Sequence, residues 1–129
     1  MRVEDYFQRV RKIVDSCPVL QLSDVAYIKR GSYEGFIRGE LYFVDGTILH
    51  LREFVDVEIT LERLMYAYQY IDSSNKLIFR YDNTNHHKKL GLPTFPHHKH
   101  QGIEENVVSS MAPCLADVLR EIEELVQLP

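Results

Sequence analysis

The fold is decided by residues 36–57, which read FIRGELYFVDGTILHLREFVDV. Apolar and polar residues alternate before the central Asp45-Gly46 pair and again after it, as they do along a half-buried strand. An Asp-Gly pair between two such runs is the strongest short-range signal for a β-hairpin. The stretch therefore predicts two antiparallel strands, over residues 36–44 and 47–57.

Charged residues of this hairpin form a candidate constellation. A two-residue turn at Asp45-Gly46 puts Arg38 opposite Glu53 if no bulge intervenes. The same register puts Glu40 on that face, opposite Leu51. The simpler interpretation is an ordinary cross-strand ion pair, and we favour it. The functional interpretation is that Glu40 and Glu53 form the floor of a histidine site, where they orient a histidine or bind a metal.

Three more segments are predicted to extend the hairpin into an antiparallel meander: a short strand over residues 25–29, one over 61–71 and one over 76–81. Three tyrosines alternate along the second of these, so they share one face: Tyr66, Tyr68 and Tyr70. Such a stripe could stack on nucleic-acid bases. More often it is the core face of a sheet or a partner interface.

Apolar residues three and four apart predict a helix at each end of the chain. The first covers residues 3–17 and ends at Pro18. The second carries its apolar stripe from Leu115 to Val126 and is capped by Ser109 or Ser110. We therefore expect an α+β fold, in which an antiparallel β-meander packs its apolar face against the N- and C-terminal helices.

The size and composition fit a single domain over residues 1–129, with 45% hydrophobic residues. No stretch approaches the roughly 20 apolar residues of a membrane span. The N-terminus lacks the continuous apolar region of a signal peptide, so we expect a cytoplasmic protein without membrane contact. The two cysteines form no CxxC pair, and we expect no disulfide between them.

The charge is unevenly distributed. The net charge is −4, yet residues 76–102 hold five lysines and arginines against one acidic residue. This basic island on an acidic body suggests an anionic ligand there. Overall acidity argues against sequence-specific binding of duplex nucleic acid.

The chemistry is expected between Arg80 and His100. Residues 82–108 show no periodicity, and a long irregular segment inside a compact domain is usually functional or disordered. Five of the six histidines lie here within fifteen residues: His86, His87, His97, His98 and His100. Histidine moves protons near neutral pH and binds metals. With Arg80, Asp82 and Lys99, these histidines supply the parts for acid–base work on a phosphate.

Three interpretations of the cluster stay open. It could be a solvated loop rich in histidine. It could hold a divalent metal through His98 and His100, which leave the same side of an extended segment, with Asp82 or Glu53 as a third ligand. It could cut or bind nucleic acid without a metal, and we favour this interpretation because the nearby lysines oppose a dication but attract a phosphate.

Under the favoured interpretation the chain is a metal-independent endoribonuclease without a cofactor. Attack by a ribose 2′-hydroxyl needs a base, an acid and a cation on the phosphate. The acid and base would be two of His86, His97, His98 and His100. Arg80 and Lys99 would hold the phosphate, and Asp82 would orient one imidazole. The alternative is a non-enzymatic module that binds nucleic acid or a partner and uses the histidines to hold a metal.

The motifs also resemble a known family. The stretch LIFRYDN with His86-His87, followed by the TFPHHKH of residues 94–100, resembles the TumE-type toxins of toxin–antitoxin pairs. The resemblance covers residues from about 36 to 128. One departure is Asn85, which stands where we expect a proline. The resemblance implies a small cytoplasmic toxin that inhibits growth and is neutralised by a helix-turn-helix antitoxin.

A partner surface is expected as well. The acidic C-terminal helix and the stripe of Tyr66, Tyr68 and Tyr70 leave surface that another chain could cover. We expect the protein to be a homodimer or to lie in a complex with its antitoxin.

Overall fold

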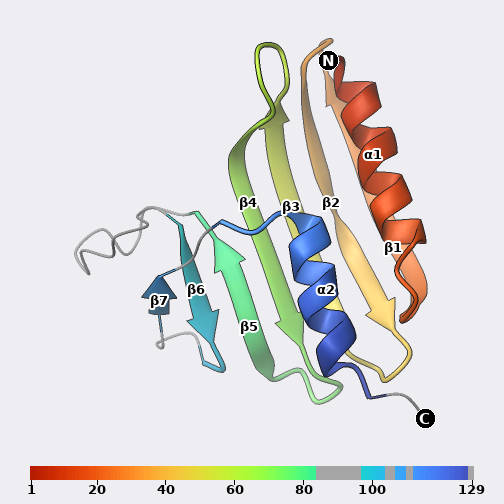
Figure 1. Ribbon diagram of the computed structural model, residues 1–129, viewed down its shortest axis with the longest axis vertical. Helices are drawn as coiled ribbons and strands as arrows, with labels where there is room; N and C mark the ends of the chain where they lie inside the picture. The colour runs from red at the N-terminus through yellow and green to blue at the C-terminus, as the bar shows by residue number, and fades with distance from the viewer. Residues whose placement is uncertain (84–96, 104–106, 110–111, 128–129) are drawn as a thin grey trace.

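The computed structural model describes residues 1–83, 97–103, 107–109 and 112–127. These residues form two helices and one sheet of seven strands, which lie side by side in chain order from β1 to β7 (Figure 1). The strands are β1 (Leu20–Arg30), β2 (Glu34–Phe43), β3 (Ile48–Asp56), β4 (Glu62–Ile71), β5 (Leu77–Asp82), β6 (His98–Gln101) and β7 (Val107–Ser109). The helices are α1 (Val3–Asp15) and α2 (Leu115–Leu125).

The predicted α+β meander is confirmed. Every neighbouring pair of strands is antiparallel, and both helices lie against the same face of the sheet (Figure 1). The helices bury the stripes that their spacing predicted: Val3, Tyr6, Phe7, Val10 and Val14 in α1, and Leu115, Val118, Leu119 and Ile122 in α2. Neither is long and apolar enough to cross a membrane.

The tyrosine stripe belongs to this core. Tyr66, Tyr68 and Tyr70 are at most 1% exposed and lie on the helix side of β4. The prediction that they form the core face is confirmed. They therefore provide no surface for a partner chain, and the expected partner interface at these residues is wrong.

The register of the central hairpin differs from the prediction by one residue. The loop contains three residues, because Phe43 pairs with Thr47 through an N–H···O bond of 3.0 Å. Gly46 closes a turn onto the Phe43 carbonyl and takes a φ of 87°, which glycine adopts without strain. A slip of one residue moves a strand's side chains to the opposite face.

The predicted cross-strand pairs are consequently wrong. Arg38 lies opposite Arg52, Glu40 lies opposite His50, and Glu53 lies opposite Ile37. Glu40 and Glu53 therefore point to different faces of the sheet, and they do not form a common floor for a histidine site.

The structure also differs from the prediction at the start of the last helix and in the segment before it. The last helix starts at Leu115 rather than after Ser109 or Ser110, and Ser109 belongs to strand β7. Ala112 precedes Pro113 and has a φ of 57°, so the backbone is not helical there. The segment predicted to be irregular over residues 82–108 contains β6 and the first two residues of β7.

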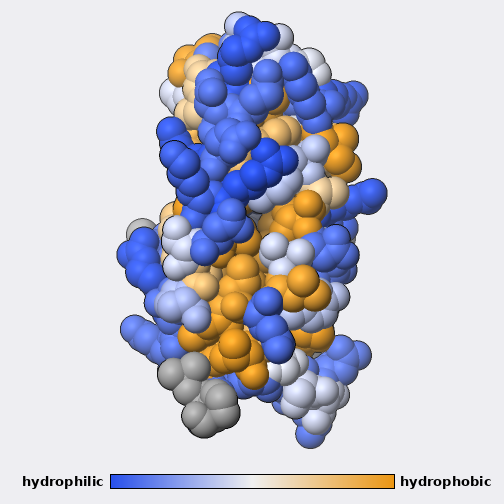
Figure 2. Space-filling model, turned by 90° about the vertical axis from the view of Figure 1, so that its right-hand side faces the viewer, coloured by the Kyte–Doolittle hydropathy of each residue, from blue (hydrophilic) through white to orange (hydrophobic). Residues whose placement is uncertain are grey.

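Strand β1 forms one edge of the sheet and is longer than the predicted residues 25–29. Figure 2, which views the molecule from the side of α1 and β1, shows hydrophobic residues gathered over the lower half and hydrophilic residues over the upper half. The sequence of β1 follows the same division, from the exposed Leu22 near its start to Lys29-Arg30 at its end. Charged residues at the end of an edge strand discourage pairing with other chains.

Candidate functional site

The candidate site lies on the face of the sheet opposite to α1 and α2, which we call the distal face. Side chains alternate between the two faces along each strand, so the register determines which residues share the distal face. One row of paired positions runs from β2 to β6 and contains Glu40, His50, Gln69, Arg80 and His100. The row beside it contains Arg38, Arg52, Ala67 and Asp82.

Three of the predicted site residues meet on this face. Strand pairing puts Arg80 opposite His100, and Asp82 lies between their side chains. Oδ2 of Asp82 is 3.0 Å from Arg80 Nε and 3.6 Å from His100 Nε2. Asp82 is 1% exposed and His100 4% exposed, while Arg80 is half-buried. We call this group the Arg80–Asp82–His100 cluster.

The cluster has the parts of a proton-transfer site. A carboxylate beside one nitrogen of an imidazole favours one orientation of the ring. Nη1 of Arg80 also lies 3.4 Å from the side-chain oxygen of Gln69, so two neighbours orient the guanidinium. An oriented imidazole beside a guanidinium can move a proton next to a bound phosphate.

Two other predicted residues lie on the helix side of the sheet. Lys99 contacts Glu121 of α2 with its Nζ at 3.1 Å from the carboxylate, and it lies over the rings of Phe79 and Tyr81. His97 stacks on the Tyr66 ring, and its Nδ1 is 2.8 Å from the Tyr66 hydroxyl. Neither residue joins the Arg80–Asp82–His100 cluster.

The structure describes only part of the other three predicted histidines, His86, His87 and His98. His86 and His87 lie outside the described residues. The backbone of His98 pairs with Asp82 on one side and Ser109 on the other, but its side chain lies outside the described part of the chain. Within that part, no group of three or more His, Cys, Asp or Glu side chains could hold a metal ion. The predicted metal site at His98 and His100 stays a prediction.

The two predicted glutamates have separate roles. Glu40 lies on the distal face, 3.7 Å from Nδ1 of His50. Glu53 is 1% exposed on the helix side, where it accepts hydrogen bonds from the hydroxyls of Tyr6 and Tyr68. Arg63 contacts the Tyr68 hydroxyl at 3.1 Å and donates to two carbonyls before α2. Glu53 therefore belongs to a buried network that joins α1, β3 and β4.

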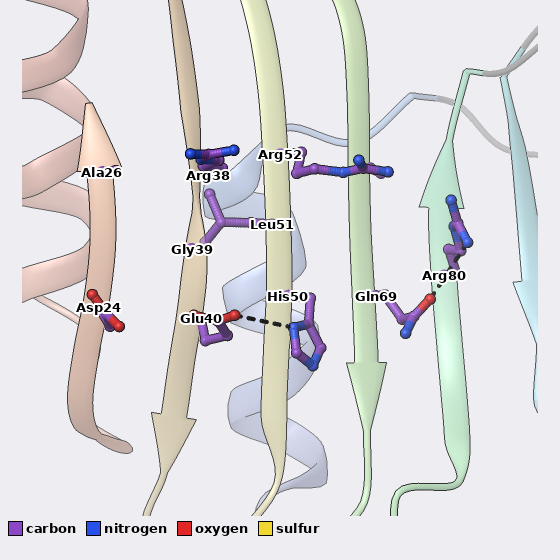
Figure 3. A pocket seen from close by; sticks show the side chains of 11 residues that line it. Asp24, Ala26, Arg38, Gly39, Glu40, His50, Leu51, Arg52, Gln69 and Arg80 are labelled. Atoms are coloured by element: carbon purple, nitrogen blue, oxygen red, sulfur yellow. Dashed lines mark hydrogen bonds and ion pairs between the residues drawn. The ribbon is translucent and has the colours of Figure 1, made fainter. Parts of the chain in front are cut away.

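Beside the cluster, a groove of about 470 Å³ crosses the distal face (Figure 3). Its lining includes Arg38, Arg52 and Arg80 together with Glu40 and His50. We did not predict Arg38, Arg52, His50 or Gln69 as site residues. The signal that could have found them was the alternation along β2 and β3, but it points to this face only once the hairpin register is correct.

The buried tyrosines predict a loss of stability in alkali. Burial raises the pKa of Tyr66 to about 12. Burial and the Glu53 carboxylate raise the pKa of Tyr68 well above its ordinary value of 10.0. The folded protein therefore holds these protons after the unfolded chain has released them, so the free energy of unfolding should fall as the pH rises above about 10 and towards 12.

Urea unfolding at a series of pH values measures this effect. The midpoint is expected to fall between pH 10 and 12, and to fall less in a Tyr6→Phe variant, because burial and Glu53 also raise the pKa of Tyr6. A midpoint that stays constant over this range would contradict the prediction.

A comparison with known proteins identifies the family of this chain. A family model described as "Toxin TumE" matches residues 10–126 of the 129-residue chain. No curated protein and no solved structure matches the chain. The matched region contains all seven strands and α2, and it begins well before the first residue at which the motifs were recognisable. The chain therefore belongs to the TumE toxin family and is the toxin component of a toxin–antitoxin pair.

Proposed function

We propose that this toxin inhibits growth by cutting RNA in the cytoplasm, as an endoribonuclease that needs no metal ion. The observation that supports the proposal is the Arg80–Asp82–His100 cluster. Its carboxylate lies within 3.0 Å of the guanidinium and 3.6 Å of the imidazole. A cation and an oriented proton carrier at one point of a sheet face are the two parts that phosphodiester cleavage needs most.

The proposed reaction begins when a base removes the proton of a ribose 2′-hydroxyl. The 2′-oxygen attacks the adjacent phosphorus, the bond to the 5′-oxygen of the next nucleotide breaks, and an acid gives that oxygen a proton. The products are a 2′,3′-cyclic phosphate and a 5′-hydroxyl. Arg80 would neutralise the developing charge on the phosphate, and Asp82 would orient His100.

His100 would serve as either the acid or the base. Among the other histidines we select His98 as its partner, because it stands two residues from His100 and its backbone pairs with Asp82. Lys99 and His97 are left out of the proposed mechanism, since their contacts are with α2 and Tyr66.

An antitoxin partner follows from the family. We propose that this antitoxin is a helix-turn-helix protein. Its binding would neutralise the toxin until the antitoxin is lost, which makes growth arrest conditional on the ratio of the two proteins.

Purified toxin with end-labelled RNA in EDTA tests the proposed reaction. We expect cleavage to products that end in a 2′,3′-cyclic phosphate, and no cleavage of the same oligonucleotide with 2′-deoxyribose in place of ribose. An absence of cleavage under all conditions would refute the nuclease. Cleavage that appears only after a divalent metal is added would refute its metal independence and favour the metal site at His98 and His100.

A further inference from the structure

Two arginines face each other on the distal face without an evident structural purpose. Arg38 in β2 lies directly opposite Arg52 in β3. Within the part of the chain that the structure describes, neither forms an ion pair or a side-chain hydrogen bond. Like charges at directly opposed positions destabilise a sheet. The protein has more acidic than basic residues, so this pairing is not a consequence of composition, and it favours a role in binding an anion.

Arg38 and Arg52 form a line of arginines with Arg80, which belongs to the candidate site. We call these three residues the arginine line. The side chain of Arg52 extends across β4 in the direction of Arg80 (Figure 3). From β2 to β5 the line crosses three strand spacings, or about 14 Å. It ends at the Arg80–Asp82–His100 cluster. An extended chain of phosphates that follows these arginines would therefore reach the proposed cleavage site.

An apolar hollow of about 340 Å³ adjoins the groove. Arg38 and Arg52 line both, and the hollow is otherwise lined by four apolar residues and one glutamate: Ile28, Phe36, Ile37, Met65 and Glu53. Phe36 stacks on Phe54 of β3, with ring centroids 4.4 Å apart and planes 9° apart. Both rings are only half-buried. The arginine line thus has an aromatic and apolar surface along one side.

Acidic side chains lie on the other side of the line. Asp24 and Glu40 line the groove below the arginines in the view of Figure 3, and Glu40 contacts His50. These carboxylates would repel a phosphate and confine it to the side of the groove that holds Arg38 and Arg52.

We propose that the distal face binds single-stranded RNA, with phosphates along Arg38, Arg52 and Arg80 and unpaired bases against Phe36 and the apolar hollow. A single strand can present its phosphates and its base faces to neighbouring parts of one surface, which is how aromatic platforms bind it. The proposal rests on the proposed function and adds the path by which the substrate reaches the cluster.

Binding of an uncleavable RNA tests this proposal separately from the nuclease activity. The probe is a fluorescent single strand of about 12 nucleotides in which each ribose carries a 2′-O-methyl group. It cannot undergo 2′-hydroxyl attack, so the wild-type chain can be used. Fluorescence anisotropy gives the binding constant at several salt concentrations.

The Arg38→Gln/Arg52→Gln variant is expected to bind the probe at least tenfold more weakly at low salt. The slope of the logarithm of the binding constant against the logarithm of the salt concentration should become shallower by about 1.4, because two phosphate contacts disappear. Phe36→Leu should weaken binding without changing the slope, because it removes a stacking surface and no charge. The matched control is Arg9→Gln/Arg120→Gln, whose exposed arginines belong to α1 and α2. It should bind as the wild type does.

Three outcomes would overturn the proposal: no salt-dependent binding by the wild type, equal losses in the Arg38/Arg52 and Arg9/Arg120 variants, or weaker binding of the antitoxin with unchanged RNA binding. The last would assign the distal face to the antitoxin. If ordinary RNA is still cut in any of these cases, the nuclease proposal stands and only the proposed binding path along the distal face is refuted. Binding as expected with no cleavage of ordinary RNA would support the path and refute the nuclease.

Discussion

Bacterial cells that produce the His100→Ala variant at the wild-type level are expected to grow without inhibition. The physical reason is that the variant lacks the imidazole that Asp82 orients beside Arg80. With purified protein, RNA cleavage should fall about 10²- to 10⁴-fold, which is the usual contribution of one positioned acid or base. Asp82→Asn should also slow cleavage, because an amide lacks the negative charge that contacts both Arg80 and His100.

His97→Ala is the matched control for this experiment. His97 stands three residues before His100 in the chain, but it stacks on the Tyr66 ring on the helix side and does not contact Asp82. This variant should remain toxic. His98→Ala should relieve toxicity if His98 is the second proton carrier. Since His100 is buried, each variant is checked by its thermal unfolding and by binding to the antitoxin. Equal toxicity of wild type and His100→Ala at equal protein levels would remove the main support for the mechanism.

The parts of the fold that could be predicted are those in which periodicity reports burial. The apolar spacing in α1 and α2 and the alternation of Tyr66, Tyr68 and Tyr70 all correspond to side chains that the core buries. Pro18 likewise lies just beyond the end of α1, which stops at Asp15. These signals are local, so one sequence was sufficient to place the two helices, the central strands and the layers.

The hairpin register could not be predicted from the Asp45-Gly46 pair alone. Asp-Gly fits a two-residue turn, but glycine also fits the last position of a three-residue loop, where Gly46 lies. The two loops differ by one residue, and that residue exchanges the faces of β3 relative to β2. The error placed Glu53 beside Arg38, and it concealed the opposition of Arg38 and Arg52.

Strand β6 was missed because its sequence gives no apolar alternation. Its helix-side position is occupied by Lys99, whose ammonium lies over the rings of Phe79 and Tyr81 and pairs with the Glu121 carboxylate. The strand forms because β5 offers it a pairing edge, which is a tertiary contact and not a local preference. The same pairing brings His100 next to Arg80. The residues of the candidate site could therefore be predicted from the sequence, but their arrangement could not.

Glu53→Ala is expected to cause a large loss of stability. Glu53 is 1% exposed, and its two carboxylate oxygens accept hydrogen bonds from the hydroxyls of Tyr6 and Tyr68. Alanine leaves both phenols without their acceptor and opens a cavity between α1 and the sheet. Breaking a buried polar network in this way costs about 3–5 kcal/mol of the free energy of unfolding. A small domain has only about 5–15 kcal/mol in total.

Two further variants show whether the network itself is responsible. Glu53→Gln fills the same volume and keeps one oxygen as an acceptor, so its loss should be clearly smaller, about 1–3 kcal/mol. Glu40→Ala removes a glutamate from the neighbouring strand, but that side chain is part of a solvent-exposed contact with His50 and should cost less than about 1 kcal/mol. Urea unfolding at neutral pH measures all three. Similar losses for Glu53→Ala and Glu40→Ala would mean that the buried carboxylate does not hold α1 to the sheet, whereas the expected order would separate two glutamates that the sequence alone placed on one face.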